Sequence, residues 1–213
     1  MFFDHEIAFA VVRHGRTAWN ADGRFQGQTD VPLDDTGRAQ ARALHDYLAS
    51  ETFDLAVSSD LSRAYETAEI ALGTRDLPIE RDPAWREMRF GTWEGLAWPE
   101  IVARHPQLAA DAAAQPKSYT PEDGEAFDDV CRRIAAALLA IDRRVSDGAR
   151  VLAVTHAGVL HALLRVALGE SEATALDVRF APATITRFAL GPRGNRLIDL
   201  NRAPGQARTS RSE

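Results

Sequence analysis

Hydrophobic and polar positions along this chain follow two alternating patterns. Short and mostly apolar runs, which are typical of strands buried on both faces of a sheet, lie at residues 7–12, 53–57 and 151–155. The longer segments between and after them predict helices at residues 36–48, 61–72, 125–145 and 158–168. Because strands alternate with helices, we predict an α/β fold, a three-layer sandwich whose mostly parallel central sheet is covered by helices on both faces.

Other segments of the chain are less regular. Residues 184–190 and 196–200 are two further β-rich pieces, whereas residues 85–93 show no regular pattern. Residues 96–123 contain four prolines, which predicts a short helix followed by a loop. Asp60 is predicted to cap the N-terminus of the helix that follows it, because its short carboxylate can accept from the first free N–H groups.

The length of the chain, 213 residues, suits one large domain and would be cramped for two. We predict a single domain over residues 1–202. The proline-bearing stretch is predicted as an insertion or lid at about 96–128, and residues 203–213 as a flexible tail.

Charge and composition exclude several classes of protein. With 25 Lys and Arg against 31 Asp and Glu, the net charge is −6, so no overall positive field exists to hold nucleic acid. No apolar stretch approaches the roughly 20 residues of a membrane span, and charge within the first six residues argues against a secretory signal. The single cysteine, Cys131, suits a reducing compartment. We therefore expect a cytoplasmic protein without nucleic-acid or membrane partners.

Lysine is nearly absent, and this narrows the possible chemistry. Lys117 is the only lysine, and no glycine-rich loop precedes it. A P-loop needs a lysine after its glycines, and a Schiff-base enzyme would have only this one candidate. The sequence therefore argues against both classes.

Two of the predicted strands end in a histidine. His14 belongs to the sequence RHG at 13–15, and His156 to THAG at 155–158. Ligands of open α/β sheets bind at the carboxyl ends of the strands, so the two histidines meet at one site if their strands are neighbours. A single histidine at such a position is more often a residue that anchors a loop, whereas two matching strand ends favour a functional pair.

Arginines lie at the same edge of the predicted sheet. Arg13 ends the first strand, and Arg63 follows the second. A guanidinium matches phosphate or carboxylate oxygens, and a buried arginine without a carboxylate partner indicates an anionic ligand. The alternative for Arg63 is a surface ion pair with Glu66 or Asp60. Two histidines and two arginines suit phosphoryl transfer, in which one histidine attacks and the other groups stabilise the transferred group.

A zinc site is the competing interpretation of the histidines. The other four, at positions 5, 45, 105 and 161, show no H-x-x-x-H spacing, and no carboxylate adjoins either strand-end histidine. We therefore expect no metal.

Five sequence blocks reinforce this picture. They are RHGRTAWN at 13–20, RFQG at 24–27 with DVPLDDTGRAQA at 30–41, SSDLSRAYETA at 58–68, REMRFGTWEG at 86–95 and THAG at 155–158. In this order they resemble the motifs of the histidine phosphatase superfamily, the phosphoglycerate mutase-like proteins. The resemblance extends from residue 11 to residue 158. It implies that the predicted three-layer sandwich has the phosphoglycerate mutase-like fold.

The resemblance implies a role for each matched residue. His14 would be the nucleophile that becomes phosphohistidine, and Glu87 would protonate the leaving oxygen and then take a proton from water. Glu87 is selected by the resemblance alone, and its alternative is an ion pair with Arg86 or Arg89. The phosphoryl group would be held by Arg13, Arg63 and His156, and the substrate by Asn20, Gln26, Gly27 and Ala157. No metal or organic cofactor is implied.

Hydrolysis is favoured over the mutase reaction. Glycolytic mutases of the family have a tyrosine shortly after the acid and a basic insertion, whereas this chain has Phe90 and only Arg104 and Lys117 as cations beside histidine between 95 and 130. We expect a phosphomonoester hydrolase that acts on a small phosphorylated metabolite. Phosphoglycerate mutase activity is the alternative, and a non-catalytic module that binds phosphorylated ligands is an alternative of another class.

Substrate specificity is expected to lie in the insertion and beside the acid. The candidates are Trp98, His105, Lys117, Tyr119 and Arg89. Trp98 and Tyr119 are equally suited to packing the insertion down. The sequence names neither the physiological substrate nor the oligomeric state.

Overall fold

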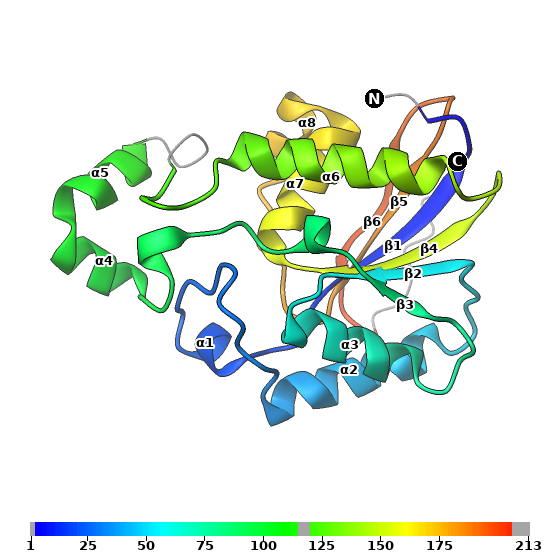
Figure 1. Ribbon diagram of the computed structural model, residues 1–213, viewed down its shortest axis with the longest axis horizontal. Helices are drawn as coiled ribbons and strands as arrows, with labels where there is room; N and C mark the ends of the chain where they lie inside the picture. Colours follow the sequence, from blue (N-terminus) through cyan, green and yellow to red (C-terminus); the bar gives the residue numbers. More distant parts are fainter. Residues whose placement is uncertain (1–2, 115–119, 206–213) are drawn as a thin grey trace.

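A six-stranded sheet runs through the centre of the molecule (Figure 1). The strand order is β3-β2-β4-β1-β5-β6, and the strands are β1 (Ile7–Arg13), β2 (Leu55–Ser58), β3 (Ile79–Arg81), β4 (Arg150–Thr155), β5 (Ile185–Leu190) and β6 (Arg196–Arg202). The first four in this order pair in parallel, while β5 and β6 are antiparallel to their neighbours. The predicted mostly parallel sheet is confirmed, and so is the pairing of the two strands that end in histidine.

Helices cover both faces of the sheet. On one face lie α2 (Asp35–Leu48) and α3 (Ser62–Leu72), and on the other lie α6 (Phe127–Asp142), α7 (Ala157–Leu168) and α8 (Glu170–Ala175) (Figure 1). The short α1 (Ala18–Ala21) and the pair α4 (Trp98–Arg104) and α5 (Pro106–Ala114) lie beyond the end of the sheet. The predicted three-layer α/β sandwich is therefore confirmed.

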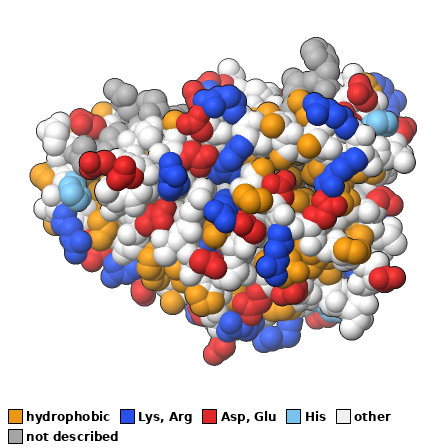
Figure 2. Space-filling model, in the orientation of Figure 1, with side chains coloured by type: hydrophobic (Ala, Val, Ile, Leu, Met, Phe, Trp, Pro, Cys, Tyr) orange, Lys and Arg blue, Asp and Glu red, His pale blue; other side chains and the backbone are white. Residues whose placement is uncertain are grey.

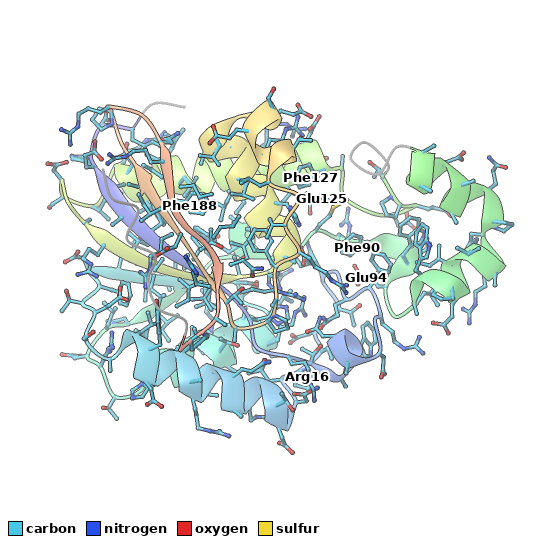
Figure 3. The ribbon with its side chains drawn as sticks, turned by 180° about the vertical axis from the view of Figure 1, so that it is seen from behind. Arg16, Phe90, Glu94, Glu125, Phe127 and Phe188 are labelled. Atoms are coloured by element: carbon cyan, nitrogen blue, oxygen red, sulfur yellow. The ribbon has the colours of Figure 1, made fainter. Side chains whose placement is uncertain are left out.

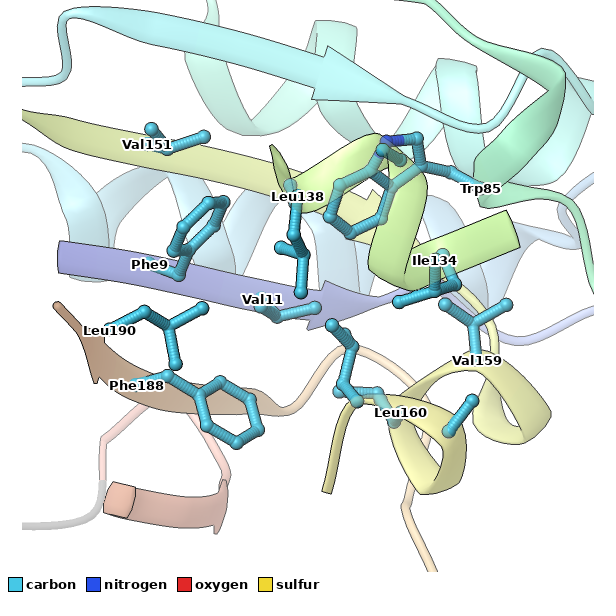
Figure 4. Close-up of a cluster of buried hydrophobic side chains, with 14 of the residues drawn as sticks. Phe9, Val11, Trp85, Ile134, Leu138, Val151, Val159, Leu160, Phe188 and Leu190 are labelled. Carbon is cyan, nitrogen blue, oxygen red and sulfur yellow. The ribbon is translucent and has the colours of Figure 1, made fainter. Parts of the chain in front are cut away.

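The apolar strands are buried on both faces because alternate side chains enter different cores. In β1, Phe9 and Val11 pack with α6 and α7, whereas Ala10 and Val12 pack with α2 and α3. Figure 4 shows the first core, in which Trp85 is also completely buried. Burying a large apolar side chain contributes about 1.5–3 kcal/mol, so both cores hold the carboxyl ends of the strands in place.

Four short elements differ from the sequence-based outline. The segment after α4 was predicted as a loop and is instead α5, because Pro106 stands at the helix start, where proline costs no hydrogen bond. The pattern of the sequence also does not predict β3, α1 and α8. These elements span three, four and six residues, too short for a periodic pattern to show.

The predicted cap of α3 is wrong. Leu61 occupies the N-cap position, and Asp60 binds Arg86 instead. The cap comes from a distant loop, since the Asp30 carboxylate accepts from the Ser62 N–H at 2.8 Å and from its hydroxyl at 2.8 Å. A cap supplied from another loop cannot be read from the local sequence.

This computed structural model describes residues 3–114 and 120–205. The end of the predicted tail, residues 206–213, lies outside the described residues, as do Lys117 and Tyr119. Within the described ranges, no helix combines the length and the apolar character needed to cross a membrane. On the face shown in Figure 2, basic and acidic side chains are interspersed.

Candidate active site

Strand register brings His14 and His156 together. Arg13 of β1 pairs with Thr155 of β4, so the next residue on each strand is a histidine. The His14 N–H donates to the Thr155 carbonyl at 2.9 Å, and the two imidazole rings lie 5.0 Å apart between centroids. Ser59 lies beside them at the end of β2, where its N–H donates to Val154. Three parallel strands thus end at one site.

His14 presents one nitrogen as a nucleophile. Its Nδ1 lies 2.7 Å from the Gly15 carbonyl, and because a carbonyl can only accept, Nδ1 carries the proton and Nε2 carries the lone pair. His14 is 2% exposed. Burial lowers its pKa well below the usual value, and the charges of Arg63 and Arg13 lower the pKa further. His14 is therefore neutral at physiological pH, the form that can attack.

His156 faces the same space as a hydrogen-bond donor. Its Nε2 lies 2.9 Å from Ser59 Oγ, which also accepts the Leu61 N–H at 3.3 Å. In the tautomer whose Nε2 accepts from the Ser59 hydroxyl, Nδ1 carries the imidazole proton and is a donor. Burial lowers the pKa of His156 well below its usual value, and Arg63 lowers it further, so the ring is neutral.

Two arginines, the half-buried Arg13 and the fully buried Arg63, supply positive charge. Arg63 is fully buried and donates to the carbonyls of Thr29 at 2.9 Å and Gly27 at 2.7 Å. Arg13 donates to the Phe180 carbonyl at 2.5 Å. Burial lowers the pKa of Arg63 to about 10, which still leaves it charged at neutral pH. Carbonyls orient a guanidinium but do not neutralise it, so both charges remain available to an anion.

The alternative interpretation of Arg63 as a surface ion pair is wrong. Asp60 is held by Arg86 at 2.6–2.7 Å, and Glu66 is held by Arg38 at 2.6 Å. Each acid therefore has another arginine as its partner.

Three buried donors of this cluster lack a partner. Arg13 Nε, Arg63 Nε and His156 Nδ1 are shielded from solvent, and none has a hydrogen-bond partner among the described residues. An unpaired buried donor costs about 1–3 kcal/mol, and native structures rarely leave one without a reason. Three such donors in the cluster around His14 and His156 can receive the oxygens of a multivalent oxyanion such as a phosphoryl group.

Glu87 lies at the N-terminus of α7, next to the histidines in space. Its carboxylate accepts from the N–H groups of Gly158 at 3.0 Å and Met88 at 2.9 Å. Its own carbonyl accepts from Gln28 and Arg133, which fixes the backbone behind the side chain. Glu87 is 8% exposed. The alternative interpretation of Glu87 as an ion-pair partner of Arg86 or Arg89 is wrong, because backbone N–H groups hold this carboxylate.

The remaining predicted residues flank the site. The amide oxygens of Asn20 and Gln26 both accept from Thr17. The NH₂ groups of these two side chains have no hydrogen-bond partner among residues 3–114 and 120–205. Gly27 contributes its carbonyl to Arg63. Ala157 begins α7 and is half-buried, and its placement shows no contact that assigns it a function.

Sequence reasoning quoted Ser59, Thr67 and Glu94 within motifs but gave them no role. Thr67 Oγ1 accepts from the Gly15 N–H at 3.0 Å and donates to the Arg63 carbonyl at 2.6 Å. Their only signal in the sequence is membership of the motif blocks, because each contacts a group that is distant in sequence.

Glu94 ties two loops together between the sheet and the α4–α5 pair, where Figure 3 shows it beside Phe90. Its carboxylate accepts from the N–H groups of Gln28, Thr29 and Phe90 at 2.9–3.1 Å and from the Thr29 hydroxyl at 2.5 Å. This carboxylate therefore holds the loop whose carbonyls orient Arg63.

The expected specificity residues are only partly located. Trp98 packs edge-on against Trp93 at 5.9 Å between ring centroids and is 38% exposed, which fits the packing role. His105 follows the last residue of α4, and Arg89 is exposed beside the acid.

Fold and site together are those of a known class. The chain belongs to the histidine phosphatase superfamily (branch 1), whose family model matches residues 9–203.

Named relatives of the chain include several phosphatases. A metal-independent phosphoserine phosphatase of Arabidopsis thaliana is 38% identical over 171 residues, which is 78% of this chain and 71% of the relative. An adenosylcobalamin/alpha-ribazole phosphatase of Salmonella typhimurium is 34% identical over 72% of this chain and 76% of its own length. Among solved structures, a mycobacterial glucosyl-3-phosphoglycerate phosphatase in complex with VO3 has a TM-score of 0.82 and 29% identity, covering 92% of this chain and 99% of that chain.

Proposed function

We propose that this protein hydrolyses phosphomonoesters of small metabolites through a phosphohistidine on His14, without a metal ion. The observation that carries the proposal is the free Nε2 of a neutral His14 surrounded by three buried donors that lack a partner. A nucleophile and positive charge around the transferred oxygens are the two things that phosphoryl transfer requires.

In the first step, His14 Nε2 attacks phosphorus. The N–P bond forms while the ester P–O bond breaks, and the leaving oxygen receives a proton from Glu87. The guanidinium groups of Arg13 and Arg63 and the Nδ1–H of His156 stabilise the charge on the phosphoryl oxygens. The NH₂ groups of Asn20 and Gln26 are further donors on the near side of the site.

In the second step, water replaces the histidine. The Glu87 carboxylate takes a proton from the attacking water, the new O–P bond forms, and the N–P bond breaks to return neutral His14. Inorganic phosphate then leaves. Glu87 acts first as acid and then as base, so one carboxyl group serves both steps.

One observation supports catalysis without a metal ion, and another supports a small substrate. Arg13 and Arg63 supply the positive charge that a metal ion would otherwise supply. The relatives include a phosphatase named for its metal independence, and their names give phosphoserine, alpha-ribazole and glucosyl-3-phosphoglycerate as substrates. We further propose that α4 and α5 form the lid of the site, as an insertion within a single domain.

The test follows phosphate release and isomer formation in the same reaction, with EDTA present. For the wild type, we expect phosphate release from p-nitrophenyl phosphate and 3-phosphoglycerate. His14→Ala should lower kcat/KM by about 10⁴-fold or more. The matched control His45→Gln, on α2, should keep wild-type rates. Retention of activity by His14→Ala contradicts the proposal, and isomerisation of 3-phosphoglycerate without net release supports the mutase alternative.

Chemical trapping tests the intermediate itself. Glu87→Gln cannot take a proton from water, but the leaving group of p-nitrophenyl phosphate needs little protonation, so the first step can still proceed with this ester. After mixing with ³²P-labelled p-nitrophenyl phosphate, the variant should accumulate label that is stable to alkali and lost in acid, as expected of phosphohistidine. The double variant His14→Ala with Glu87→Gln should remain unlabelled. Label that persists in the double variant would place the covalent bond elsewhere.

A further inference from the structure

A cavity of about 550 Å³ lies beside Glu87, between the N-terminus of α6, α7 and α8. Its lining includes Met88 and Gly158, whose N–H groups both hold the Glu87 carboxylate. Phe127, at the first turn of α6, forms another part of the lining, and Figure 3 shows it above Phe90 on the side of the molecule where the strands end. Two residues of the lining therefore contact the group that would protonate the leaving oxygen.

A second contact joins the cavity to the phosphoryl site. His161 lines the cavity and packs edge-on against Phe180 at 5.0 Å between ring centroids, and the Phe180 carbonyl accepts from Arg13. The charge of Arg13 also lowers the pKa of His161, after burial, which shows that the two side chains are near each other. The lining is thus connected to Glu87 directly, through Met88 and Gly158, and to Arg13 through His161 and Phe180.

We propose that this cavity receives the alcohol part of the substrate and selects alcohols that carry hydroxyl or amine groups and no second anionic group. The inference rests on the proposed function, because it places the leaving group of that reaction. It narrows the substrate class to monoesters of uncharged or amine-bearing alcohols.

The charge of the lining carries this selection. Arg165 is the one guanidinium of the lining, and it is already paired with Asp128 at 2.7 Å and Glu170 at 3.3 Å. The carboxylate of Asp177 has no ion pair or hydrogen bond within the part of the chain that the structure describes. His161 is neutral. Negative charge is therefore in excess, so a carboxylate or second phosphate on the alcohol would be repelled and an amine attracted.

The rest of the lining fits the carbon skeleton of such an alcohol. Met88, Phe127 and Val178 present apolar surface between the charged residues. Ligand sites commonly combine apolar walls with a few polar groups that fix orientation. Here Asp177 and His161 are the polar groups of the lining that have no hydrogen-bond partner among residues 3–114 and 120–205.

A cation outside the cavity would favour the opposite substrate preference, for alcohols that carry a second anionic group. Arg179 is exposed, and its charge lowers the pKa of Arg13, so it lies near the phosphoryl site. If the alcohol extended toward Arg179 instead of into the cavity, a second anionic group would be favoured. The two directions therefore predict opposite substrate preferences.

The experiment compares kcat/KM within two matched pairs of substrates. O-phosphoethanolamine differs from O-phosphoserine, and glycerol 3-phosphate from 3-phosphoglycerate, mainly by a carboxylate. We expect the ester without the carboxylate to be preferred by about tenfold or more in each pair. Asp177→Lys should abolish or reverse the preference, and Asp177→Asn should reduce it. The matched control Asp46→Lys changes the net charge equally on α2 and should leave it unchanged.

Three outcomes separate the inference from the function on which it rests. The inference is overturned if phosphate release depends on His14 but shows no preference within the pairs, or if the preference survives Asp177→Lys. The proposed function stands in both cases. A preference for the carboxylate esters that Arg179→Ala removes places the alcohol on the Arg179 side. Release that survives His14→Ala overturns both.

Discussion

At the scale of single residues, Gly158 decides where the Glu87 carboxylate lies. Its N–H donates to Glu87 Oε1 at 3.0 Å at the start of α7, where free N–H groups favour a negative charge. A Cβ at position 158 would come within 2.3 Å of that same oxygen. Glycine is therefore required here for the close approach of a carboxylate to the backbone.

Gly158→Ala should displace the acid and leave the nucleophile in place. Because protonation of the leaving oxygen contributes about 10²–10⁴-fold, we expect kcat/KM for an alkyl phosphate to fall by about 10²-fold. The loss should be much smaller for p-nitrophenyl phosphate, whose leaving group needs little protonation. Steady-state kinetics with both esters measures the difference. Glu87→Asp, which shortens the acid, should lower kcat/KM less when it is added to Gly158→Ala than when it is made in the wild type. Equal losses of kcat/KM for the two esters in Gly158→Ala would contradict this role of Gly158.

The same scale shows what could be predicted about the site. His14, His156, Arg13 and Arg63 could be selected from the residues, because strand ends and unpaired arginines have a pattern in sequence. Glu87 could not, since its selection depends on backbone groups 71 residues away. The resemblance to a family named Glu87, and the structure shows how it is held.

At the scale of elements, the loop after α1 depends on one carboxylate. Glu94 accepts four hydrogen bonds, three of them from Gln28 and Thr29. That loop provides the carbonyls of Gly27 and Thr29 that orient the Arg63 guanidinium. Gly27 has a φ of +54° and no room for a Cβ beside Glu94, so the loop and the carboxylate fit only as a pair.

Glu94→Ala should loosen this loop and therefore the charge that binds phosphate. Hydrogen bonds to a charged group contribute about 1.5–3 kcal/mol each, and neighbouring bonds are not additive, so we expect a loss of about 2–4 kcal/mol in the free energy of unfolding. KM and the inhibition constant for inorganic phosphate should rise together. Glu94→Gln keeps one acceptor oxygen and should lose about half as much. Urea unfolding and phosphate inhibition measure both effects, and an unchanged inhibition constant in Glu94→Ala would show that the loop does not position Arg63.

Elements also differ in how well their sequences predict them. The strands β1 and β4 and the helix α6 were predictable because their apolar patterns persist over five or more residues. The helix α5 was not, because its first-turn proline resembled a loop signal. The start of α3 was misplaced because its capping group, Asp30, comes from another loop.

At the scale of the whole molecule, this acidic protein has a positively charged site because two arginines are largely shielded from solvent. The net charge is −6, yet Arg13 and Arg63 carry their charges inside, next to two histidines. Protonating either histidine would add a third positive charge in a poorly solvated space. The fold therefore holds both rings neutral, which suits a nucleophile and also makes the stability of the protein depend on pH.

We expect the free energy of unfolding to fall as the pH falls below about 6.5. In the unfolded chain each histidine takes up a proton near pH 6.5, whereas burial keeps the pKa values of His14 and His156 well below that in the folded protein. Between these pKa values the unfolded state binds more protons, so acid favours unfolding. The two groups together contribute a slope that approaches about 2.7 kcal/mol per pH unit about one unit below pH 6.5, and that ends once the pH passes below the folded pKa values.

Urea unfolding at pH 7.5, 6.5 and 5.5 and constant ionic strength measures this slope. Carboxylates also titrate toward acid pH, so the informative quantity is the difference between the wild type and a variant that lacks the two imidazoles. His14→Asn with His156→Asn should lower the slope between pH 6.5 and 5.5 by up to about 2.7 kcal/mol per unit, while His45→Gln should leave it unchanged. An equal slope in the double variant and the wild type would mean that the buried pair is protonated in the folded protein. It would then carry the positive charge that a nucleophilic His14 cannot have.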